Sequence, residues 1–123
     1  MSEKKGFICV VDDDFSNLEA VRSLLSAVGL QMVLFENPRL FLEHARYHPV
    51  SLAIVDVWMP GLNGLEVQRL LLDIAPEVPV IVMTGREDPG VQRIALAQGA
   101  IAFLNKPFSE AALLQAIRRV LPE

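Results

Sequence analysis

Five short apolar runs alternate with five longer stretches of helical periodicity along this chain, and no other feature restricts its fold as much. The runs are apolar throughout instead of alternating with polar residues, as is typical of strands buried on both faces. They span residues 7–11, 31–35, 52–55, 80–83 and 102–104. A strand–helix unit repeated five times predicts a parallel sheet covered by helices on both faces, which is a three-layer α/β domain.

The stretches between the runs carry the start and stop signals of helices. Asn37-Pro38 and Asp88-Pro89 each place a capping side chain before a proline that suits the first helical position. Further caps are expected from Asp14 and Ser109, and helix ends at Gly29, Pro76 and Gly99. The inward faces of the first, third and fifth helices are predicted to contain Leu18, Val21, Leu25 and Val28; Leu65, Leu70, Leu71 and Ile74; and Leu113, Ile117 and Val120.

Length and charge limit what such a domain can do. With 123 residues the chain is expected to form a single domain, residues 1–123. A net charge of −4 argues against direct nucleic-acid binding, and no segment approaches membrane-spanning length. The lone Cys9 excludes a disulfide framework and favours a buried thiol in a reducing compartment, consistent with the cytoplasm.

Polar side chains follow four of the five predicted strands. Asp12, Asp13 and Asp14 follow the first, Asp56 the third, Thr84 the fourth, and Asn105, Lys106 and Pro107 the fifth. Ligands of open parallel sheets bind beyond the carboxyl ends of the strands. The fold is therefore expected to gather several carboxylates, one hydroxyl and one ammonium at a single edge.

Clustered carboxylates repel one another and are stable as anions only beside a cation. Oxygen ligands with room for water suit Mg²⁺. No Cys/His cluster exists for zinc, and His44 and His48 are interpreted as surface residues away from this edge. With Mg²⁺ bound, Asp56 is a plausible nucleophile toward phosphorus, while Lys106 shares the charge of the phosphoryl group and Thr84 donates its hydroxyl to it.

The motifs also allow three other interpretations, each of which the sequence disfavours. A dinucleotide-binding domain needs a glycine-rich turn after the first strand, where this chain has VVDDDFSN. A haloacid-dehalogenase-like phosphatase would use Asp12 and Asp14 as its nucleophile motif, but it requires a late acidic pair after the lysine, and only Glu110 and Glu123 follow Lys106. A phosphorylation-independent interaction module should have lost one of the edge groups, and none is missing.

The segments VVDDD, VDVWMPGLNGLE, VIVMTG and GAIAFLNKPF stand in this order at four strand ends. Together they resemble the receiver domain of two-component response regulators, from Ile8 to about Leu121. The resemblance implies a flavodoxin-like, doubly wound (βα)5 sheet with strand order 2-1-3-4-5, the order also described for a chemotaxis receiver.

The resemblance also implies roles for individual residues. Asp56 matches the phospho-acceptor, Asp13 the direct Mg²⁺ ligand with Asp12 beside it, the backbone carbonyl of Trp58 a third ligand, and Lys106 the phosphate-binding lysine.

The switch residues of the family have counterparts as well. Thr84 matches the switch hydroxyl and Phe103 the switch aromatic, although a plain core aromatic explains Phe103 equally well. The Lys106–Pro107 bond matches one that is cis in the family.

In such a protein a histidine kinase, a phosphotransfer protein or a small donor supplies the phosphoryl group, and the receiver catalyses only its own modification. The surface of the fourth helix, fifth strand and fifth helix then controls an output domain or target. The resemblance is to receivers that precede a transcriptional output domain with a helix-turn-helix.

Ile101 and Ala102 replace an Asp-Asp pair of one dimerising subfamily, which argues against that symmetric dimer and leaves other phosphorylation-dependent homodimers open. Trp58 and Arg86 stand where the family tunes dephosphorylation, and their bulk predicts a long-lived phosphoryl group.

Overall fold

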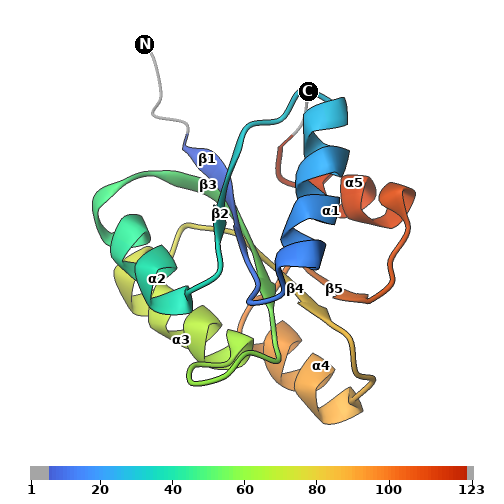
Figure 1. Ribbon diagram of the computed structural model, residues 1–123. Helices are drawn as coiled ribbons and strands as arrows, with labels where there is room; N and C mark the ends of the chain where they lie inside the picture. The colour runs from blue at the N-terminus through green and yellow to red at the C-terminus, as the bar shows by residue number, and fades with distance from the viewer. Residues whose placement is uncertain (1–5, 122–123) are drawn as a thin grey trace.

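All five apolar runs form strands of one parallel sheet in the computed structural model, which describes residues 6–121. The strand order is β2-β1-β3-β4-β5, as the resemblance implied, and the predicted fold class is confirmed (Figure 1). The strands are β1 (Phe7–Val11), β2 (Met32–Phe35), β3 (Val50–Asp56), β4 (Val80–Thr84) and β5 (Ala102–Asn105). The helices are α1 (Phe15–Ala27), α2 (Pro38–Tyr47), α3 (Gly64–Ile74), α4 (Pro89–Ala97) and α5 (Glu110–Arg118).

The sheet separates two apolar cores, because successive strand side chains point to opposite faces. Cys9 and Val11 face the core beneath α2, α3 and α4, whereas Ile8 and Val10 face the core beneath α1 and α5. Figure 1 shows this three-layer arrangement. The central strands are buried on both faces, which explains why their sequences are continuously apolar.

The helices begin where the sequence predicts, whereas some residues expected on their buried faces are exposed or only partly buried. Asp14, Asn37, Asp88 and Ser109 each accept a backbone N–H at the start of a helix. Gly29 and Gly99 end helices with positive φ, a conformation that glycine adopts without strain.

The prediction for Val28 was wrong, since this residue caps the end of α1 and is exposed. In α3 the buried face consists of Gly64, Val67, Gln68 and Leu71, while the expected Leu65, Leu70 and Ile74 are only partly buried. His48 is exposed as expected, but His44 is half-buried, with its ring stacked on His48 and tilted against Phe35.

The strand register brings the polar strand ends together. Val11 pairs with Val55, so Asp12 and Asp56 leave β1 and β3 at the same level. On the other side of β3, Asp56 pairs with Met83, which precedes Thr84. The backbone N–H of Lys106 donates to the Thr84 carbonyl at 2.7 Å and continues the β4–β5 pairing to the same edge.

The connection from β3 to α3 folds tightly back onto Asp56. Asn63 starts α3 with a capping box, in which its side chain accepts from the Glu66 N–H and Glu66 accepts from the Asn63 N–H. The Gly64 N–H donates to the Val57 carbonyl at 2.8 Å, and a Cβ on Gly64 would lie only 2.2 Å from the Asp56 carbonyl oxygen. Glycine is required at this close approach, which fixes the backbone of Asp56.

Replacing Gly64 by alanine is expected to destabilise the protein by about 2–4 kcal/mol, because backbone atoms of Asp56 and Val57 must move to admit the methyl group. Urea denaturation measures the change. Gly85→Ala is the matched control, since a Cβ there meets no atom within 4 Å. Equal midpoints for the two variants would show that the contact does not constrain the β3–α3 connection.

Candidate functional site

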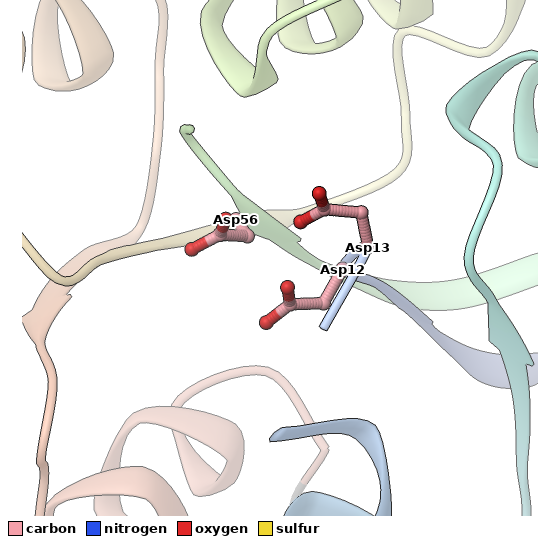
Figure 2. A group of neighbouring side chains, drawn as sticks. All are labelled: Asp12, Asp13 and Asp56. Carbon is pink, nitrogen blue, oxygen red and sulfur yellow. The ribbon is translucent and has the colours of Figure 1, made fainter. Parts of the chain in front are cut away.

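Three carboxylates meet at the carboxyl edge of the sheet. Asp12 and Asp13 leave the end of β1 and Asp56 ends β3, and Figure 2 shows their carboxylates projecting to the same side. One oxygen from each lies within 4.8 Å of the others. Asp12 and Asp56 are 1 % and 3 % exposed, whereas Asp13 is open to solvent. Two of the three negative charges are thus held almost out of water, where their repulsion is strong.

Lys106 supplies the positive charge at this cluster. Its Nζ donates to Asp12 Oδ2 at 3.0 Å and lies 2.8 Å from Asp56 Oδ1. Asp12 Oδ1 accepts the Asp14 backbone N–H at 3.0 Å, so both oxygens of Asp12 are engaged. Asp56 Oδ1 is different: it is ion-paired by distance, but among residues 6–121 it is the only buried side-chain polar atom without a hydrogen-bond partner.

The pKa of Asp56 is raised to about 6. Burial is the main cause, and the charges of Asp12 and Asp13 add to it, while Lys106 opposes the shift. Burial alone would lower the pKa of Lys106, but its contacts with Asp56 and Asp12 raise that pKa above the usual value. Lys106 therefore stays charged, whereas burial and the neighbouring carboxylates oppose the ionisation of Asp56.

Thr84 lies at this edge with its hydroxyl bonded to the backbone of Arg86. The side chain is fully buried, and Oγ1 both donates to the Arg86 carbonyl and accepts the Arg86 N–H at 3.1 Å. Phe103 is partly buried and lines a cavity of about 330 Å³ between α4, β5 and α5. The Lys106–Pro107 peptide bond is cis, as in the family that the motifs resemble.

A cavity of about 250 Å³ opens above the carboxylates. Besides the acidic residues and Lys106, its lining includes Trp58, Arg86 and Asn17. The Arg86 guanidinium carbon lies 4.5 Å from the centre of the Trp58 ring, a cation–π contact between the β3–α3 and β4–α4 loops. Asn17, on the first turn of α1, was not predicted, because no motif signals a lone asparagine at that position.

The donor set fits a hard divalent cation. Asp12, Asp13 and Asp56 offer only oxygen ligands, and within residues 6–121 Asp56 Oδ1 receives no hydrogen bond, although Lys106 lies 2.8 Å away. The exposure of Asp13 leaves room for the water ligands that Mg²⁺ retains. Thiol and imidazole ligands are absent from the cluster, which disfavours zinc.

Fold and edge together define a class: a doubly wound α/β domain with an acidic, lysine-paired cation site at the ends of its parallel strands. The chain belongs to the response regulator receiver domain family, whose model matches residues 8–118. This finding confirms the resemblance and does not support the phosphatase and dinucleotide alternatives.

Named relatives agree with this membership. The chain is 37% identical over 121 residues to the response regulator protein TodT of Pseudomonas putida, covering 98% of this chain and 53% of TodT. It is 33% identical over 122 residues to the transcriptional regulatory protein FixJ of Bradyrhizobium diazoefficiens, covering 96% and 60%. The solved response regulator StyR superposes with a TM-score of 0.83 at 39% identity, covering 95% of this chain and 59% of that one. The chain thus spans about half the length of the curated relatives it matches.

The raised pKa of Asp56 predicts a pH-dependent stability for the metal-free protein. The folded state holds this proton up to about pH 6, whereas the unfolded chain releases it near 3.8. The free energy of unfolding should therefore fall as the pH rises from about 4 to about 6, by about 3 kcal/mol at most from this group. Urea denaturation at a series of pH values in EDTA measures the slope.

Asp56→Asn is the informative variant, because it removes the titrating group and keeps its shape. Its unfolding free energy should lack this part of the decline, so the difference between wild type and variant should change with pH across this range. A constant difference from pH 4 to pH 7 would contradict the raised pKa.

Proposed function

We propose that residues 1–123 form one phospho-accepting receiver domain and that Asp56 accepts the phosphoryl group. The observation that carries this proposal is the state of Asp56: a nearly buried carboxylate whose Oδ1 is paired with Lys106 by distance but receives no hydrogen bond, held beside two further carboxylates at an open cavity. A structural aspartate would be expected to have its oxygens satisfied.

In the proposed reaction a carboxylate oxygen of Asp56 attacks the phosphorus of the donor. The new bond joins that oxygen to phosphorus, and the bond from phosphorus to the donor's nitrogen or oxygen breaks, its electron pair leaving with the donor. The product is an aspartyl phosphate. Lys106, whose Nζ already lies 2.8 Å from Asp56, is placed to pair with a phosphoryl oxygen.

The cation would be held by Asp13 and Asp56, with Asp12 beside them and the backbone carbonyl of Trp58 as a further ligand. When bound, Mg²⁺ neutralises the acidic cluster and the charge on the transferring phosphoryl group. The chain's own part is to orient Asp56 through β3 and the Gly64 contact, and to keep Lys106 charged.

The switch proposed for Thr84 requires its hydroxyl to leave the Arg86 backbone and donate to the phosphoryl group. Phe103 would respond at the surface formed by α4, β5 and α5. A phosphorylation signal of this kind acts only if partners bind the two states differently. The expected partners are a histidine kinase or phosphotransfer protein and an output domain or target, whose expected role is transcriptional control. A phosphorylation-dependent homodimer would use the same surface.

The domain itself is not expected to bind nucleic acid or to act on other substrates. No helix within residues 6–121 has the length and apolar character needed to cross a membrane. The buried, unpaired Cys9 agrees with the proposed cytoplasmic location.

Incubation with acetyl phosphate and Mg²⁺ should add one phosphoryl group to the wild type, and EDTA should abolish the gain. Asp56→Asn should gain none, because its amide is not a nucleophile toward phosphorus. Intact-mass spectrometry measures both, and Asp73→Asn, on the exposed side of α3, is the matched control that should behave as wild type. No gain by wild type, with Mg²⁺ binding shown separately, would favour the phosphorylation-independent module.

The phosphoryl group should be lost more slowly than in chemotaxis receivers, because Trp58 and Arg86 stack at the mouth of the cavity and restrict an attacking water. Trp58→Asn and Arg86→Ala should each speed the loss, as measured by intact mass over time. Arg39→Ala, on the exposed face of α2, is the control. Decay within seconds that neither variant alters would refute this role of the pair.

A further inference from the structure

Helix α4 is lightly attached to the core. It has nine residues, of which only Val91 and Ala95 are buried. Ile94 and Leu96 are about half exposed. Apolar burial is the main force that holds a helix against a sheet. So small an apolar contact leaves polar contacts with a large share of the task of fixing the position of α4.

Those polar contacts gather at the C-terminal end of α4. Gln68 of α3 is 2 % exposed, and its Nε2 donates to the Ala95 carbonyl at 2.9 Å. Gln98, which caps α4, donates from its Nε2 to Gln68 Oε1 at 2.8 Å and to the Leu65 carbonyl at 3.2 Å. The same Ala95 carbonyl accepts the Ala100 N–H at 3.0 Å, so Gln68 bonds to the carbonyl on which the helix end closes.

The N-terminal end of α4 has no comparable attachment. Its cap, Asp88, bonds only to Gly90 and Val91 of the same helix. Residues 85–88, which join it to Thr84, are exposed. Within the described part of the chain, no side-chain hydrogen bond joins the first turn of α4 to another element.

We infer that Gln68 and Gln98 form a hinge. Their hydrogen bonds hold the C-terminal end of α4 on α3, so that α4 pivots about this end when the Thr84–Arg86 turn rearranges. The inference rests on the proposed function, because phosphorylation of Asp56 supplies the rearrangement. A buried amide is costly unless it is bonded, so the paired amides favour one position of the helix end over neighbouring ones. An apolar contact there would be non-directional and would let the helix slide.

Hydrogen exchange of the full chain, measured for each backbone amide, tests whether the two glutamines hold the end of α4. In metal-free Gln68→Met, the amides of Gln98, Gly99 and Ala100 should exchange about tenfold faster than in wild type, because the helix end opens more often. Gln92→Met, the same change at an exposed position of α4, is the matched control and should leave these amides unchanged. Gln98→Met is the second variant, in case Gln68→Met does not fold.

The pivot itself is tested with Mg²⁺ and beryllofluoride, a phosphoryl mimic. In wild type the exchange changes should be confined to residues 85–91 and leave 98–100 unaffected. In Gln68→Met or Gln98→Met the changes should extend along the whole helix. A merely structural glutamine would alter stability without altering where the response ends.

Two results would overturn the inference. One is equal exchange at residues 98–100 in wild type and both variants; the other is a wild-type response that already runs through residue 100. Phosphorylation by acetyl phosphate, read by intact mass on the same samples, separates the two proposals. Full phosphorylation with either of these results refutes the hinge alone, whereas absent phosphorylation refutes the proposed function and the hinge's regulatory role with it.

Discussion

The ammonium of Lys106 lies between two carboxylates that the sheet holds almost out of water, 3.0 Å from Asp12 and 2.8 Å from Asp56. Parallel pairing forces this meeting, because the ends of β1, β3 and β5 reach one edge. One lysine cannot balance three carboxylates. The cluster is therefore left with excess negative charge, which adds to the effect of burial in raising the pKa of Asp56. The affinity for a cation and for an electrophilic phosphorus that we propose follows from this imbalance.

The surroundings of the cluster differ in how firmly they are held. Asp56 stands on a strand buried on both faces, and Gly64 presses the start of α3 against its backbone. The β4–α4 loop is instead exposed, and α4 beyond it buries two side chains. A rigidly held carboxylate beside a loosely attached helix suits the switch that we propose, since a local change of charge moves most easily what is weakly fixed.

Much of the fold and the polar edge could be predicted from the sequence, because both follow from local patterns. Continuous apolar runs indicate buried parallel strands, and the residues just after them must share one edge. The faces of the helices were predicted less well. Gln68 is buried since Ala95 and Gln98, far along the chain, satisfy its amide, and no local pattern contains that information. The stacking of Arg86 on Trp58 likewise depends on how the β3–α3 and β4–α4 loops meet.

The most direct test of the account locates the phosphoryl group chemically. After incubation with acetyl phosphate and Mg²⁺, borohydride reduces an aspartyl phosphate to homoserine, and peptide mass spectrometry then identifies the reduced position. If Asp56 is the acceptor, homoserine should appear at residue 56, with Asp12 and Asp13 unchanged. Homoserine at another aspartate, or phosphate on a residue that borohydride does not reduce, would contradict the assignment of Asp56 as the acceptor.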